Sequence, residues 1–246
     1  MKIFKEIFGR IWALWGIISF VLTFLIIFIP SMIPYLMPDL KGQRFFIKVS
    51  KIWMTVWLYL VGCPLKVKGK ENFAKNTAYI VTCNHNSLLV IPISCPFIPG
   101  ANKTIAKTSF TKVPLFGWFY RKGAVLVDRK SEISRRKSFE EMKRVLALGM
   151  HMSVYPEGTR NRTQEPLKKF YDGAFKLAVD TKTAIIPAII FNSKKALPVN
   201  KSFFFIPHCL QMHFLEPVPA DGLTTDQLKE KVFSIMKDYY VQHNHQ

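Results

Sequence analysis

An uncharged stretch near the N-terminus constrains the fold most. Residues 11–38 contain no charged side chain, and residues 11–29 read IWALWGIISFVLTFLIIFI. About 20 consecutive apolar residues suffice for a helix to span the hydrocarbon core of a bilayer. The missing polar face argues against a helix buried in a soluble core, and the length of the run argues against a cleaved signal peptide. We therefore expect a membrane-embedded helix.

A second apolar stretch, residues 52–61, is too short to cross a membrane comfortably and carries Trp53, Trp57 and Tyr59. Such rings suit the headgroup region of a bilayer. We favour a hairpin of two helices dipping into one leaflet, with a single crossing as the alternative. Basic residues lie on both sides of the first stretch, so the positive-inside rule gives no clean orientation. Residues 1–62 are assigned to membrane anchoring and residues 63–246 to a folded domain.

The charge balance indicates an anionic partner. Lys and Arg number 35 against 16 Asp and Glu, a net charge of +19. Many aromatic residues lie in the apolar N-terminal third and form no basic-aromatic RNA-binding pattern, which favours membrane lipids over nucleic acid. The four cysteines are too scattered for a CxxC pair or a zinc site. We expect reduced, buried thiols, no metal, and a domain on the cytoplasmic side of the membrane, with two disulfides of a secreted protein as the alternative.

Strands and helices alternate after residue 62. The pattern predicts strands near residues 78–83, 124–127, 152–155, 184–191 and 210–215, and helices over residues 133–148 and 225–241. Thr224 followed by Gln227 has the spacing of a capping box at the start of the last helix. Alternation of this kind predicts an α/β fold with a mostly parallel sheet covered by helices.

Polar residues follow several of these strands. His85 lies just after the first, at the sheet edge where α/β proteins bind ligands. A histidine there is a candidate general base, although alone it is more simply explained as a structural loop contact. Arg129 ends the second strand, and the turn containing Gly158 and Arg160 follows the third. Pro187 lies inside the fourth, which a central strand would normally exclude.

Four blocks occur in a specific order: NHNSLL at residues 84–89, GAVLVDR at 123–129, PEGTR at 156–160 and IIPA at 185–188. Their order and spacing resemble the sequence blocks of the glycerolipid acyltransferases, the family of 1-acylglycerol-3-phosphate O-acyltransferases. Residues 106–117 resemble the link between the first two blocks, and the apolar N-terminus resembles the family's anchor. The resemblance implies transfer of a fatty acyl chain from acyl-CoA or acyl carrier protein to the free hydroxyl of 1-acylglycerol-3-phosphate, giving phosphatidic acid, without metal or cofactor.

The resemblance also implies roles for individual residues. His85 would be the general base that takes the proton of the acceptor hydroxyl. Arg129 and Arg160 would hold the acceptor phosphate, and Glu157 would orient its glycerol end. Gly158 and Thr159 would shape the turn, and Lys107 would add positive charge. Together the expected site is His85, Lys107, Arg129, Glu157, Gly158, Thr159 and Arg160.

One position departs from the family pattern. The first block normally has an aspartate five residues after the histidine, and here that position is Val90. Valine has no acceptor with which to orient the imidazole. Three interpretations stay open: another group such as Asp128 or Asp172 substitutes, the protein is a catalytically weak relative that binds lipids, or an otherwise normal enzyme carries a substitution. Glycerol-3-phosphate and a lyso-aminolipid stay open as alternative acceptors.

Overall fold

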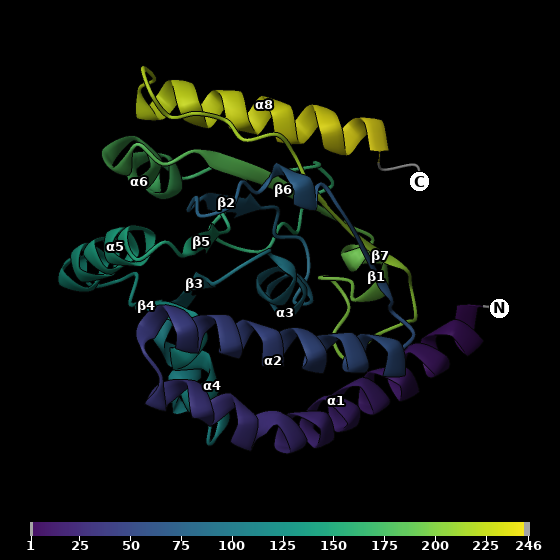
Figure 1. Ribbon diagram of the computed structural model, residues 1–246. Helices are drawn as coiled ribbons and strands as arrows, with labels where there is room; N and C mark the ends of the chain where they lie inside the picture. The colour runs from purple at the N-terminus through teal and green to yellow at the C-terminus, as the bar shows by residue number, and fades with distance from the viewer. Residues whose placement is uncertain (1, 244–246) are drawn as a thin grey trace.

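The computed structural model describes residues 2–243 as an α/β fold built on one seven-stranded sheet (Figure 1). The strand order is β1-β7-β6-β2-β5-β3-β4, and only β6 and β7 pair antiparallel among the described strands. The predicted mostly parallel sheet is therefore confirmed. The strands are β1 (Leu65–Lys68), β2 (Ile80–Cys83), β3 (Asn102–Lys107), β4 (Ala124–Val127), β5 (His151–Val154), β6 (Ile185–Phe191) and β7 (Leu210–Phe214).

Helices cover both faces of the sheet. They are α1 (Lys2–Met32), α2 (Asp39–Leu60), α3 (Val90–Ser94), α4 (Phe116–Gly123), α5 (Glu132–Ala147), α6 (Gly173–Thr181), α7 (Ser193–Ala196) and α8 (Thr225–His243). Short 3₁₀ turns are η1 (Ile33–Leu36), η2 (Lys70–Asn72), η3 (Cys95–Phe97) and η4 (Thr108–Lys112). In Figure 1, α5, α6 and α8 lie on one side of the sheet and α1, α2 and α4 on the other.

The predicted capping box opens α8. The backbone N–H of Thr224 donates to Gln227 Oε1 at 2.9 Å, and the N–H of Gln227 donates to Thr224 Oγ1 at 3.3 Å. These two bonds satisfy donors that the first turn of a helix leaves free. The helix therefore begins where the sequence pattern indicated.

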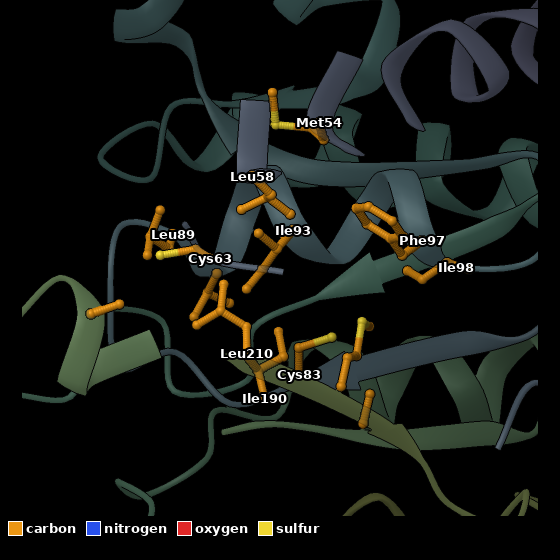
Figure 2. Close-up of a cluster of buried hydrophobic side chains, with 14 of the residues drawn as sticks. Met54, Leu58, Cys63, Cys83, Leu89, Ile93, Phe97, Ile98, Ile190 and Leu210 are labelled. Atoms are coloured by element: carbon orange, nitrogen blue, oxygen red, sulfur yellow. The ribbon is translucent and has the colours of Figure 1, made fainter. Parts of the chain in front are cut away.

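Alternating side chains of the central strands feed two cores. Ile186 and Ile190 of β6 pack toward the N-terminal helices, whereas Ile185 and Ile189 pack toward α5, α6 and α8. Because both faces are covered, the strand reads as a continuous apolar run rather than as an alternating one. Figure 2 shows the first core, where Met54 and Leu58 of α2 lie over side chains of α3 and the sheet: Cys83, Ile93, Ile190 and Leu210.

The two N-terminal helices form an antiparallel hairpin joined by tryptophan side chains. Trp12 Nε1 donates to the carbonyl of Val61, and Trp57 Nε1 donates to the carbonyl of Gly16, at 3.0 and 3.1 Å. Trp53 Nε1 donates to Thr23 Oγ1 at 2.9 Å. Within the described residues, the stretch from Ile3 to Leu36 alone is long and apolar enough to cross a membrane, judged by length and composition.

The expected position of the tryptophans in the second apolar stretch is wrong. That stretch is the last part of α2, and Trp53 and Trp57 are buried rather than placed in a headgroup layer. The reason is α1, whose Phe20 packs against both indole rings. Tyr59, on the opposite side of α2, is 69% exposed.

The hairpin packs on the rest of the chain along its length. Gly9 and Gly16 of α1 lie against Phe204 and Phe205, and Phe24 contacts Phe119 of α4. A side chain at either glycine would collide with these rings. The described residues of the predicted anchor, 2–62, thus share a core with those of the predicted domain, 63–243.

Pro187 lies in a central strand, contrary to the usual exclusion. It pairs with Thr82 of β2 on one side, and its carbonyl accepts a hydrogen bond from the N–H of Leu215 on the other. This contact falls between the end of β7 at Phe214 and the isolated bridge from Ile185 to Val218, where the ladder is interrupted. The interruption accommodates a strand residue that has no N–H.

All four cysteines are free thiols, but the expectation that all are buried is wrong. Cys63 and Cys83 are buried, whereas Cys95 is half-buried and Cys209 is exposed. Cys209 precedes β7 in a surface segment, so the sequence around it carries no burial pattern.

Candidate active site

The loop after β2 is fixed by every polar side chain of the NHNS block except His85. Asn84 is fully buried, and its side-chain amide donates to the carbonyl of Ile190 and accepts from its N–H. Asn86 Oδ1 accepts from Ser193 Oγ at 2.7 Å, and Ser87 Oγ donates to the carbonyl of Leu197 at 2.9 Å. These bonds tie the loop to β6 and α7. His85 is the one side chain of the block left for chemistry.

Glu157 holds the backbone of His85. Its Oε1 accepts the N–H of His85 at 2.6 Å, and its Oε2 accepts the N–H of Lys168 at 2.9 Å. The carboxyl group is fully buried. Burial raises the pKa of Glu157 to about 7, against the opposing effect of the two backbone hydrogen bonds and of Lys168. The expectation that Glu157 orients the glycerol does not fit this geometry, because both of its oxygens are occupied below the pocket.

A cavity of about 610 Å³ opens at the carboxyl ends of β2, β3, β4 and β5. It is lined by six of the seven residues expected at the site: His85, Lys107, Arg129, Gly158, Thr159 and Arg160. Residues that lie up to 75 positions apart, His85 and Arg160, meet here because parallel strands end at one edge of the sheet. We refer to this cavity as the reaction pocket.

The turn after β5 brings cations to the reaction pocket. Arg129 Nη1 donates to the carbonyl of Gly158, which joins the end of β4 to this turn, and Lys168 Nζ donates to Thr159 Oγ1 at 2.7 Å. Gly158 has a φ of 67°, and a Cβ there would lie 2.8 Å from the ring of Tyr171. A larger residue would therefore be strained and would displace the turn.

His85 is a neutral imidazole at pH 7. Burial, with the nearby positive charges of Arg160, Arg129 and Lys168, lowers the pKa of His85 to about 4. Among the described residues, Nδ1 is buried without a hydrogen-bond partner. The ring of Tyr155 lies beside the imidazole, 5.0 Å between centroids, and its hydroxyl pairs with Ser94 Oγ at 2.7 Å. The histidine is thus an available proton acceptor that nothing polar orients.

Neither aspartate considered as a substitute partner contacts His85. Asp128 is exposed and accepts from the N–H of Lys130, and Asp172 accepts from Lys229 Nζ. Val90 begins α3 and is fully buried. The suggestion that Asp128 or Asp172 replaces the missing carboxylate is therefore wrong for the arrangement seen here. Within residues 2–243, no group of three His, Cys, Asp or Glu side chains has the geometry to hold a metal ion.

A family model for acyltransferases matches residues 64–191, which is more than half of the chain and includes the reaction pocket. The chain belongs to the acyltransferase family. Two similar relatives are the 1-acyl-sn-glycerol-3-phosphate acyltransferase of Saccharomyces cerevisiae, 34% identical over 74% of this chain, and the alpha form from Homo sapiens, 30% identical over 74%. The alignments span 60% and 64% of those relatives, so the chain covers less than two thirds of their length.

A solved structure has the same fold. The 1-acyl-sn-glycerophosphate (LPA) acyltransferase PlsC from Thermotoga maritima superposes with a TM-score of 0.79, covering 98% of this chain and 97% of that chain at 23% identity. The match includes the N-terminal hairpin, because 98% of the chain is covered. The antiparallel hairpin packed on an α/β sheet is thus a fold that this chain shares with that solved structure.

A second, apolar cavity adjoins the reaction pocket of this acyltransferase. It has a volume of about 260 Å³ and lies between α2, α3 and α4. Five residues line both cavities: Leu88, Ile91, Thr104, Phe110 and Tyr120. Its inner walls come from residues of the hairpin, among them Phe46, Ser50 and Trp53. We refer to it as the α2 pocket.

Sequence reasoning missed several residues of the reaction pocket. Arg162, Lys168, Tyr120 and Tyr155 all line it. Lys168 lies in an irregular segment after the PEGTR block, where no periodic pattern indicates which side chain faces the pocket. The one available signal was chemical, since Arg162 and Lys168 continue the positive charge of Arg160.

Proposed function

We propose that this protein transfers a fatty acyl chain from a thioester donor, acyl-CoA or acyl carrier protein, to the free hydroxyl of 1-acylglycerol-3-phosphate. The product is phosphatidic acid. The observation that carries the proposal is the reaction pocket, where a neutral histidine faces a group of cations. A base for a hydroxyl and a site for a phosphate thus lie within one cavity.

The proposed reaction needs one proton acceptor. His85 lines the reaction pocket, and its Nε2 takes the hydroxyl proton as the oxygen attacks the thioester carbonyl. The tetrahedral intermediate then collapses, the C–S bond breaks, and the leaving thiolate takes the proton from the imidazolium. A thioester is already a good electrophile, so no metal or cofactor is required in this scheme.

The acceptor phosphate is proposed to bind Arg160 together with Arg129, Arg162 and Lys168, all of which line the reaction pocket. Guanidinium groups pair with phosphate oxygens through parallel hydrogen bonds. The same cations disfavour an imidazolium at His85. A dianionic phosphate bound between them would offset this effect, so acceptor binding would itself make His85 a stronger base.

The α2 pocket is proposed to hold the acyl chain of the donor. It is apolar, and it meets the reaction pocket along residues that carry no charge. A donor chain lying there would place its thioester carbonyl beside His85. Because the walls come from α2 and α4, donor chain length would depend on the hairpin as well as on the sheet.

Membrane association is proposed to occur through the hairpin, with the folded domain on the cytoplasmic side. The outer face of α1 exposes a row of large apolar side chains, including Ile7, Leu14, Val21 and Ile26. The inner face of α1 is packed against α2 and the segment near Phe205. This geometry favours a hairpin lying in one leaflet over a single crossing. Partners would then be membrane lipids and the thioester donor, not nucleic acid.

The test is acyl transfer in detergent micelles with a fatty acyl-CoA and three acceptors. Product from lysophosphatidic acid above that of a His85→Ala control would support the proposal. Equal rates with lysophosphatidylethanolamine would contradict a phosphomonoester site, and preference for glycerol-3-phosphate would identify the alternative acceptor.

The unpaired Nδ1 of His85 favours a second candidate, a lipid-binding relative with weak catalysis. Such a protein would bind lysophosphatidic acid with unchanged affinity after His85→Ala and would form no product above that control. Turnover well above the control would refute this second candidate.

A further inference from the structure

A third cavity, of about 580 Å³, runs from the reaction pocket to the outer side of the hairpin. Its walls are α1 and the segment of residues 197–205, and Trp57 forms part of its base. Three residues line both this cavity and the reaction pocket: Leu88, Arg160 and Arg162. We refer to it as the α1 groove.

We infer that the α1 groove holds the acyl chain that the acceptor already carries. This inference rests on the proposed function, because it needs a phosphate-bearing lysolipid as the acceptor. It assigns the two apolar cavities to two different chains, the donor's in the α2 pocket and the acceptor's in the α1 groove. The two cavities meet along Phe20, Leu88 and Pro92, which line both.

The position of the arginines decides which cavity takes which chain. In a lysolipid phosphate the three-carbon glycerol links the phosphate to the ester, so its chain must begin within a few bonds of the phosphate. Arg160 and Arg162 line the α1 groove, whereas no charged side chain of residues 2–243 lines the α2 pocket. A thioester donor carries its phosphates far from the acyl carbon, so its chain needs no cation nearby. Charge complementarity therefore matches the lysolipid to the α1 groove.

The outer end of the α1 groove leads to apolar surface. Ile17 and Phe203 line the groove and are 53% and 49% exposed, respectively. They adjoin the exposed apolar face of α1, which continues through Leu14 and Val21. A lysolipid in the leaflet that contacts this face would insert its acyl chain laterally into the α1 groove. Its headgroup would then reach the arginines.

Leu88 stands where the three cavities meet, since it lines all of them. It belongs to the NHNSLL block and lies three residues after His85, with its side chain 53% exposed. In the inferred complex it separates the two chains just before they reach the imidazole. The neighbouring Leu89 lines only the α1 groove of these three cavities and is otherwise buried in the core.

The first experiment measures binding, so that it does not depend on turnover. Monomeric lysophosphatidic acids with chains of 6 and 8 carbons are titrated into the full chain by calorimetry. Burial of two more methylenes is expected to tighten binding about 15-fold in the wild type. In Ala13→Leu, whose larger side chain fills the α1 groove from α1, the ratio of the two affinities is expected to fall toward 1. Ser50→Leu, which makes a similar change in the α2 pocket, is expected to keep it.

The second experiment locates the chain without filling any cavity. A lysophosphatidic acid with a brominated chain, kept below its micelle concentration, quenches tryptophans that it touches. Trp57 lines the α1 groove and Trp53 lines the α2 pocket. We expect Trp57→Phe to remove most of the quenching and Trp53→Phe to leave it.

The outcomes separate the two claims. Two results would overturn the assignment of the α1 groove while leaving a lysolipid phosphate as the acceptor. One is loss of the affinity ratio between the two chain lengths in Ser50→Leu, and the other is quenching that depends on Trp53. Failure of wild-type protein to bind lysophosphatidic acid at all would overturn the proposed function, and the groove assignment with it. A misfolded Ala13→Leu variant leaves the quenching measurement to decide.

Discussion

Replacing Val90 with aspartate perturbs the candidate site at the position where it departs from its family's pattern. His85 Nδ1 is buried without a partner among the described residues, and the surrounding burial and cations lower the pKa of His85 to about 4. Relative to an ordinary histidine near 6.5, the imidazolium is disfavoured by about 3 kcal/mol. Since the proposed transition state places a proton on His85, this free-energy cost raises the activation barrier and lowers the rate.

A carboxylate within reach of Nδ1 would oppose that cost. An opposite charge at 4–6 Å shifts a pKa by about 1–3 units, which corresponds to about 10- to 1,000-fold in imidazolium stability. Fixing the tautomer adds to this, as in the serine-protease triad, where neutralising the aspartate lowers turnover by about 10⁴. We therefore expect Val90→Asp to raise kcat by about 10²–10⁴.

The pH profile supplies an independent readout. The folded pKa of His85 lies below its unfolded value, so the base is lost only as pH falls through about 4. In Val90→Asp the acid limb of kcat/KM is expected to move up by about 1–3 units. Val90→Asn, which has similar shape without the charge, should shift neither the limb nor the rate to the same extent. Because Val90 is fully buried, thermal melts must accompany each rate.

The assay is acyl-CoA-dependent acylation of lysophosphatidic acid in micelles, with His85→Ala/Val90→Asp as background. If folded Val90→Asp has the rate and acid limb of the wild type, the imidazolium does not limit the reaction, and the reasoning from the unpaired nitrogen fails. A gain that survives His85→Ala would place the introduced carboxylate, rather than the histidine, in the base role.

Three further predictions test the supporting residues. Arg160→Ala should raise the KM for lysophosphatidic acid about 10- to 100-fold, with partial recovery in Arg160→Lys, because lysine keeps the charge but not the paired donors; an unchanged KM would remove Arg160 from the phosphate site. Glu157→Gln should lower kcat about 100-fold at unchanged acceptor affinity, since its amide would face the N–H of Lys168. The folded pKa of Glu157 is raised to about 7, so the wild type should lose up to about 3 kcal/mol of stability as the pH rises from 4.5 to 7. The Gln variant should not show this loss, and urea titrations across that pH range measure it. A chain starting at Cys63 should be insoluble rather than merely released from membranes, because Met54, Leu58 and neighbours complete the core, and a soluble, cooperatively unfolding fragment would contradict this.

The sheet could be predicted where strands are buried on both faces. β2, β5 and β6 are buried throughout, and β6 is a continuous apolar run, whereas β2 includes Thr82 and β5 includes His151 and Ser153. β1 and β3 were not predicted as strands, because half of their residues point outward. β1 reads Leu-Lys-Val-Lys at the sheet edge, and β3 mixes Asn102 and Lys103 with apolar residues. The sequence signal for these two strands was the alternation of residues that face the core with residues that face outward.

The start of α2 was missed for a related reason. Lys41, Arg44, Lys48 and Lys51 belong to the basic residues that flank the first apolar stretch, but they lie on one face of α2 at helical spacing, all exposed. Gln43, Phe46 and Ile47 occupy the opposite, buried face. The period of 3.6 residues, rather than the charge count, therefore contained the information on this segment.

The order of the sequence blocks predicts which residues form the candidate site, but it does not predict the role of each residue within the site. A motif gives residues and spacing, whereas burial decides which polar groups face a ligand. Glu157 illustrates this: its conspicuous place beside Gly158 suggested contact with substrate, yet its carboxyl lies fully buried under the loop. No sequence pattern distinguishes a carboxylate that binds backbone from one that binds glycerol.

The same burial argument bears on what the missing aspartate means. The loop that carries His85 is positioned by Asn84, Asn86, Ser87 and Glu157, and none of these bonds involves residue 90. The scaffold around the histidine thus stays complete when position 90 is valine. In the proposed mechanism, the absence of the aspartate would leave the base in place and weaken only its orientation and its charge balance. A bound phosphate among the same cations would restore part of that balance, which makes the acceptor itself the best substitute for the absent carboxylate that this pocket offers.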